Sequence, residues 1–328
     1  MSFKYNNSLF VNDTYNDLYT AFQKKQESFI TQDYDLIINF KTMTCKHILY
    51  HSTKIYDVTL SKEKFQPILV EKSRLKVLLV YVGIGYHSFP EKYIKTFYNM
   101  RLTFLHQDIL PIPVFWANDH LYEIIIEKSN LSNIFYKDNP FQLYIQKKWS
   151  DIVLLTSPKL EDIFENHFIW FKKQCDLYKI KYTKLLFWAT SGSTIPLLNC
   201  LKSKNGLGQV TNTFFILSGS LYSFIYRLTK DPSIEIKEYL KDITLKNNKI
   251  INILYDIDPL GSLLLNPDTT KILTKDINFQ RLQSPIIDFV VESNLFLKFF
   301  KAISGLIQHT LYLKNKNIMN LIIQLANQ

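Results

Sequence analysis

Cysteine and glycine are both scarce in this chain. The three cysteines, Cys45, Cys175 and Cys200, lie far apart, and no two have the C-x-x-C spacing of a redox or zinc motif. This usage is typical of a reducing compartment and excludes a disulfide framework. Among the eight glycines, Gly83 and Gly85 lack the third glycine of a dinucleotide loop, and no Gly-Lys-Ser/Thr phosphate loop is present. Two common nucleotide-binding classes are therefore excluded.

Long hydrophobic runs are missing as well. The longest, residues 77–85 and 214–226, are about half of the roughly 20 residues that a membrane-spanning helix needs. The first residues of the sequence lack the apolar run of a signal peptide. We therefore expect a soluble intracellular protein without a membrane partner.

Hydrophobic and basic residues are abundant instead. The 328 residues are 47% hydrophobic and 15% aromatic, which is enough to fill a core and excludes wholesale disorder. The formal net charge is +10, and a basic surface can contact nucleic acid because lysine and arginine neutralise phosphates. The lysines are scattered in pairs without a long run. We expect either a solvated basic surface or a weak nucleic-acid contact.

Three short, continuous apolar runs predict strands of one parallel sheet. They are residues 75–82, 184–188 and 249–255, and each has the pattern of a strand that is buried on both faces. Helical patterns at residues 160–177 and 195–202 lie between them. Strands that alternate with helices imply right-handed crossovers, so the fold class is predicted as α/β with a central parallel sheet.

The intervals between these runs indicate the domain organisation. Residues 1–75 are predicted to form an N-terminal extension, residues 76–300 the core, and residues 301–328 a C-terminal helix. Within the core, residues 90–183 are far more than the roughly 10 to 15 residues that a single crossover needs. We therefore expect this interval to be a large insertion.

Polar side chains follow two of the predicted strands. Thr190 and Ser191 come after residues 184–188, and Asp256 comes directly after residues 249–255. In parallel α/β sheets, ligands bind at the carboxyl ends of the strands. With Lys241 on the loop between them, a hydroxyl can hydrogen-bond a phosphoryl group, an ammonium can offset its charge and a carboxylate can hold Mg²⁺. The combination favours phosphoryl-transfer chemistry.

An ordered set of motifs resembles the small C-terminal-domain phosphatases of the haloacid dehalogenase (HAD) superfamily. The set comprises Tyr-Leu-Lys-Asp-Ile-Thr-Leu at 239–245, an apolar strand at 250–255, Asp-Ile-Asp-Pro at 256–259, and Asn-Pro-Asp-Thr at 266–269. The resemblance implies a HAD-like three-layer sandwich with a central parallel sheet. It assigns phosphate binding to Lys241 and to Thr190 or Ser191, and gives Asp256 the role of metal ligand, for Mg²⁺ if the protein is active.

The sequence departs from this family at the nucleophile. The family needs an Asp-x-Asp pair after the first strand, one carboxylate to attack phosphorus and one to protonate the leaving group. If residues 75–82 are that strand, Tyr81 and Gly83 occupy the two aspartate positions, and neither supports this chemistry. We therefore assign no catalytic residue, and we predict no cofactor and an inactive phosphatase homologue. Asp256-Ile257-Asp258 is an alternative Asp-x-Asp pair, but too little chain follows it to complete the core.

Two other catalytic signals are weak. Gly192-Ser193 is not followed by the spacing of a nucleophile elbow. The seven histidines show no metal-ligand spacing, since His47 and His51 are four residues apart but have no accompanying Glu or third ligand. We expect these histidines to be structural.

A degenerate phosphatase-like core with a divergent first half resembles the nucleocapsid-assembly protein family shared by baculoviruses and nudiviruses. That resemblance implies a role in nucleocapsid assembly and genome packaging of a large insect DNA virus. The implied partners are capsid or DNA-condensing proteins, and the implied locations are the host nucleus and the virion nucleocapsid. Two alternatives stay open: an active Mg²⁺-dependent protein phosphatase of the HAD superfamily, and a basic structural or nucleic-acid-binding protein.

Overall fold

The structure is a computed structural model. It describes residues 34–39, 44–50, 68–69, 75–81, 83, 100, 103–104, 107–114, 155, 158–177, 181–203, 206–229, 236–265, 271–273, 284–293 and 311–328. The chain forms two compact units, one from residues 1–75, 84–98 and 115–182, the other from residues 76–83, 99–114 and 183–328. No helix in these described ranges is long and apolar enough to cross a membrane.

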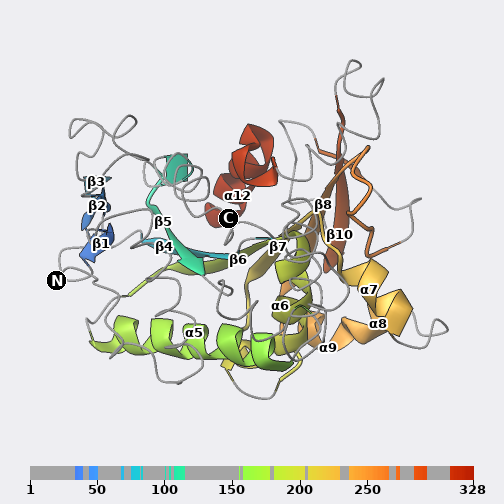
Figure 1. The fold of residues 1–328 in the computed structure, drawn as a ribbon, viewed down its shortest axis with the longest axis horizontal. Helices are drawn as coiled ribbons and strands as arrows, with labels where there is room; N and C mark the ends of the chain where they lie inside the picture. Colours follow the sequence, from blue (N-terminus) through green and yellow to red (C-terminus); the bar gives the residue numbers. More distant parts are fainter. Residues whose placement is uncertain are drawn as a thin grey trace, which may run out of the picture. The chain divides into compact units, whose positions relative to one another are not determined.

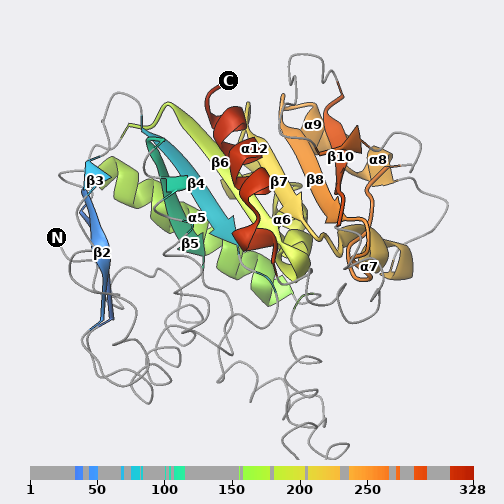
Figure 2. The same cartoon turned by 90° about the horizontal axis from the view of Figure 1, so that it is seen from above.

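The second unit contains a seven-stranded sheet in which every neighbouring pair is parallel. Its order is β5 (Ile109–Val114), β4 (Lys76–Tyr81), β6 (Lys184–Thr190), β7 (Phe214–Ser218), β8 (Lys249–Tyr255), β10 (Ile286–Val291) and β9 (Lys271–Ile272). Figure 2 shows the sheet face on. The predicted α/β class and parallel sheet are confirmed, and the three apolar runs are β4, β6 and β8.

Burial explains why these strands are almost continuously apolar. In β4, β6, β7 and β8, all residues after the first one or two are buried. Hydrophobic side chains alternate between the two faces of a strand, so both faces must be covered. Ile253, in the middle of β8, has no exposed surface, and β8 lies between β7 and β10, so the prediction of a strand buried on both faces is confirmed.

Helices of the same unit cover both faces of the sheet. α6 (Thr194–Cys200) connects β6 to β7 and lies against one face, whereas α12 (Lys316–Ala326) lies over the other (Figures 1 and 2). α7 (Tyr222–Thr229), α8 (Ile236–Tyr239) and α9 (Lys241–Thr244) connect β7 to β8. The unit is thus an α/β/α sandwich, with apolar residues of α12 such as Ile318 and Ile322 fully buried.

The strand order places a topological switch between β4 and β6. From β4 the chain goes to β5 on one side, and then returns to build β6, β7 and β8 on the other side. Ligands of open α/β sheets bind at such a switch, outside the carboxyl ends of the strands. Because β5 lies within residues 90–183, part of the interval that was expected to be an insertion belongs to the sheet.

The first unit contains a small antiparallel sheet and a long helix. Its strands are β1 (Tyr34–Asn39), β2 (Thr44–Tyr50) and β3 (Ile68–Leu69), in that order, and its helix is α5 (Pro158–Leu177). The helix confirms the pattern at 160–177. A C-terminal helix was predicted for residues 301–328, and α12 confirms its last part. Residues 301–310 lie outside the described residues.

Candidate functional site

The strands β4 and β6 end side by side, and the chain segments that follow them meet closely. A Cβ atom at Gly83 would lie 2.8 Å from Ser191 Cβ and 3.0 Å from the carbonyl oxygen of Thr190. Real Cβ atoms do not approach other atoms that closely. Position 83 must therefore be glycine for the segment after β4 to pass this close to Thr190 and Ser191. Gly83 therefore serves close packing against the segment after β6, and is not merely a lost aspartate.

Ser191 forms a sharp turn between β6 and α6. Its φ is 54°, in the left-handed region that an L side chain rarely adopts. β6 ends at Thr190, a single helical turn follows at Ser191–Ser193, and α6 begins at Thr194. Ser191 is only 6% exposed. A strained serine at the carboxyl end of a central strand is a candidate functional residue, because such strain persists only where surrounding structure enforces it.

Hydrogen bonds hold this turn in place. Ser193 Oγ accepts from the backbone N–H of Thr190 at 3.0 Å, and its one proton can go to either of two carbonyl oxygens, that of Thr190 at 2.8 Å or that of Tyr81 at 3.0 Å. Thr194 Oγ1 donates to the carbonyl oxygen of Ser191 at 2.7 Å. The Ser193 hydroxyl therefore lies between the ends of β4 and β6, and the Thr194 hydroxyl supports the conformation of Ser191.

Two carboxylates follow β8 at the same edge of the sheet, and they have different surroundings. Asp256 is exposed, and its Oδ1 accepts from the backbone N–H of Ser293 at 2.9 Å and from the Ser293 hydroxyl. These bonds join the ends of β8 and β10. Asp258 is half-buried, and its Oδ1 accepts from the backbone N–H of Leu260 at 2.9 Å. A Cβ atom at Gly261 would lie 2.9 Å from Asp258 Oδ2, so glycine leaves room for this carboxylate.

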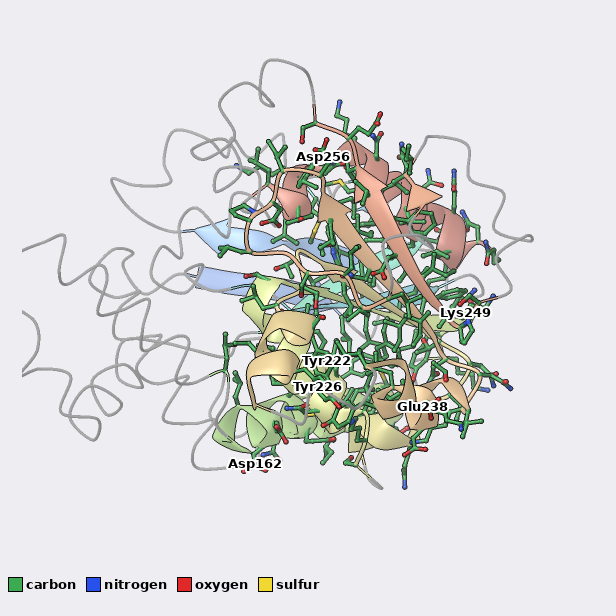
Figure 3. The ribbon with its side chains drawn as sticks, turned by 90° about the vertical axis from the view of Figure 1, so that its right-hand side faces the viewer. Asp162, Tyr222, Tyr226, Glu238, Lys249 and Asp256 are labelled. Carbon is green, nitrogen blue, oxygen red and sulfur yellow. The ribbon has the colours of Figure 1, made fainter. Side chains whose placement is uncertain are left out.

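Lys241 lies at the opposite, amino-terminal edge of the sheet. It begins α9, which precedes β8, and the turn after α9 contacts the segment before β7 through the Asn212 N–H to Lys246 carbonyl bond of 3.2 Å. Lys241 Nζ is 3.6 Å from Glu238 and its side chain is 61% exposed. In Figure 3, Glu238 lies toward the Lys249 end of β8, away from Asp256. A seven-residue strand spans roughly 20 Å.

The residues assigned to phosphate and metal binding are therefore not all together. Tyr81 and Gly83 meet Thr190 and Ser191 at the switch, but β6 and β7 separate β4 from β8. With strands about 4.8 Å apart, the ends of β4 and β8 are roughly 14 Å from each other. Among the described residues, no group of three His, Cys, Asp or Glu side chains could hold a metal ion. Asp256, already bonded to Ser293, does not fit a Mg²⁺ site by itself.

No protein-family model matches this chain, and no curated protein matches it either. The site must therefore be interpreted from its own geometry. Gly192-Ser193 lacks the spacing of a nucleophile elbow, whereas the residue with the strained backbone is Ser191. A usable signal was present: small residues, Ala189 and Ser193, stand two positions before and after this serine, as the two glycines do in G-x-S-x-G.

Proposed function

We propose that this protein is a serine hydrolase that acts on acyl substrates through Ser191. The observation that carries the proposal is a left-handed serine between a central parallel strand and a helix, at the topological switch of the sheet. This strand–turn–helix arrangement resembles the nucleophile elbow of α/β-hydrolases, in which the turn presents the serine hydroxyl above the sheet edge. The turn at Ser191 and the nucleophile elbow are alike in local geometry and in their position after a central strand. The proposed chemistry therefore rests on this site and not on the fold as a whole.

The proposed reaction uses groups at this edge of the sheet. Ser191 Oγ attacks the acyl carbonyl carbon and forms an acyl-serine ester, the alcohol leaves with a proton, and water then hydrolyses the ester. The backbone N–H of Gly192, the residue after the nucleophile, is the expected oxyanion donor. Asp258 is the expected acid, because its carboxylate is fixed and half-buried at the same edge.

Histidine is the usual general base of such a site. The structure describes the side chain of no histidine. In the sequence, His309 is the one histidine after Asp258, which matches the order serine, acid, histidine found in α/β-hydrolases. His309 lies outside the described residues, so mutation of His309 is the test of its role as the base.

A fluorophosphonate probe tests the proposal directly, because it phosphonylates activated serines. We expect the probe to label the purified protein at Ser191, as read by peptide mass mapping, and para-nitrophenyl butyrate to be hydrolysed. Ser191→Ala and His309→Ala should lose both signals. Ser284→Ala, which removes an exposed serine at the amino-terminal end of β10, is the control and should behave like the parent. Absence of labelling in the folded parent protein would overturn the proposal.

The phosphatase-like, HAD-type assembly role remains a separate prediction. Its support is the ordered motif match between residues 239 and 269, together with the α/β class, and the distance between Lys241 and Asp256 gives it no further support. The predicted capsid partners, nuclear location and basic nucleic-acid contact have the same status. Assays with para-nitrophenyl phosphate across Mg²⁺ concentrations test the alternative of an active phosphatase, because the assembly role predicts no turnover. Magnesium-dependent turnover that Asp256→Ala abolishes would favour the phosphatase.

A further inference from the structure

Tyr312 connects the C-terminal part of the chain to the carboxylate of Asp258. It begins the short helical turn Tyr312–Lys314 before α12, and only 1% of it is exposed. Its hydroxyl donates to Asp258 Oδ2 at 2.6 Å and accepts from the backbone N–H of Tyr255, the last residue of β8, at 2.9 Å. Both hydrogen-bonding functions of this hydroxyl are therefore occupied by groups at the end of β8.

A second tyrosine hydroxyl in the same cluster has different partners. The rings of Tyr255 and Tyr312 pack with centroids 4.8 Å apart. Tyr255 Oη accepts from Asn315 Nδ2 at 2.6 Å, and Asn315 also caps α12 by accepting from the backbone N–H of Asn317 at 2.8 Å. The two hydroxyl groups thus lie in one buried cluster, but only that of Tyr312 bonds to Asp258 in the hydrogen bonds of the described residues.

We propose that Tyr312 is a positioning residue that orients the Asp258 carboxylate for the Ser191 site. A carboxylate can rotate about its bond to Cβ unless both oxygens are held. Here Oδ1 is held by the backbone N–H of Leu260 and Oδ2 by the Tyr312 hydroxyl, so the plane of the group is set. Catalytic side chains keep a productive geometry when a buried residue behind them holds them by a hydrogen bond. The inference rests on the proposed function.

The matched variants Tyr312→Phe and Tyr255→Phe test this role. Each removes one hydroxyl from the packed pair of tyrosines and keeps both rings, so circular dichroism and thermal melting should show that both variants fold. The measured quantity is the second-order rate of fluorophosphonate labelling at Ser191. We expect Tyr312→Phe to label about tenfold more slowly, since a hydrogen bond to a charged group is lost. Tyr255→Phe should label within about twofold of the parent, because its hydroxyl has another partner.

A double-mutant cycle separates positioning from a general loss of stability. In the Asp258→Asn background, adding Tyr312→Phe should slow labelling no further, because the group to be oriented is already altered. Equal slowing by Tyr312→Phe and Tyr255→Phe, or full additivity with Asp258→Asn, would overturn the positioning role while leaving the proposed function intact. A parent protein that is not labelled at all overturns the proposed function and this inference together.

Discussion

At the scale of single residues, the strongest feature is the backbone at Ser191. An L residue at a φ of 54° brings its Cβ close to its own backbone, whereas glycine has no such clash. The neighbouring hydroxyl groups of Ser193 and Thr194 hold the turn, and Gly83 packs directly on it. The conformation is therefore imposed by the surroundings, at a local cost in free energy.

This strain predicts the relative stability of two variants at one position. Ser191→Gly and Ser191→Ala both remove the hydroxyl, but only glycine adopts the left-handed conformation without strain. We expect the free energy of unfolding of Ser191→Gly to exceed that of Ser191→Ala by about 1 kcal/mol, as measured by chemical denaturation. Equal stabilities would mean that Ser191 does not have a positive φ in solution.

At the scale of elements, α12 begins with a well-defined cap. Asn315 has an extended backbone with φ −76° and ψ 116°, and its Oδ1 accepts from the backbone N–H groups of Asn317 and Ile318. Those N–H groups have no partner within the helix, so the cap satisfies them. The helix then places an apolar stripe, including Ile318 and Leu321, against the sheet.

The cap predicts different outcomes for two asparagines of this region. Asn315→Ala removes the two cap bonds and the bond to Tyr255, so we expect the free energy of unfolding to fall by about 1 to 2 kcal/mol. Asn320→Ala changes an exposed position within the helix, where alanine has the better helix propensity, and should be neutral or slightly stabilising. Chemical denaturation of both variants checks this. Similar losses for the two would show that α12 is not capped by Asn315.

At the scale of the whole molecule, one buried carboxylate connects the sheet to the segment after the Asp258 turn. Asp288, in β10, has no exposed surface and accepts from Asn252 Nδ2 at 2.6 Å. It also accepts from the backbone N–H groups of Leu264 at 3.1 Å and Leu265 at 2.7 Å. Burial raises the pKa of Asp288 above its ordinary value of 3.8, although these three bonds act in the opposite direction.

The raised pKa predicts a pH dependence of stability. Because the folded state disfavours the ionised form, the contribution of Asp288 is largest at low pH and is lost as the pH rises through the raised pKa. Relative to Asp288→Asn, the parent should therefore be most stable below about pH 4 and lose that advantage toward neutral pH. Denaturation curves of both proteins from about pH 3 to pH 7 measure the difference. A difference that grows with pH would show that the hydrogen bonds outweigh burial.

The periodicity of the sequence was sufficient to predict β4, β6 and β8, but not β5, which lies in the interval that was expected to be an insertion. β4, β6 and β8 were recognisable because a strand covered on both faces is apolar at every position, not at alternate ones. The helix α5 was recognisable from its spacing of apolar residues. The pattern of apolar residues in a segment depends on which of its own side chains are buried. It can therefore be read from that segment alone.

The composition of the site depended on tertiary structure. The position of a polar residue after a strand predicts the edge of the sheet, but strand order decides which of those residues are neighbours. Lys241 belongs to a connection at the amino-terminal edge, whereas Thr190 and Asp256 lie at the carboxyl edge, so the expected group of these three residues does not form. The φ of Ser191 and the bond from Tyr312 to Asp258 arise from contacts between segments far apart in the chain, and local sequence preference carries no record of such contacts.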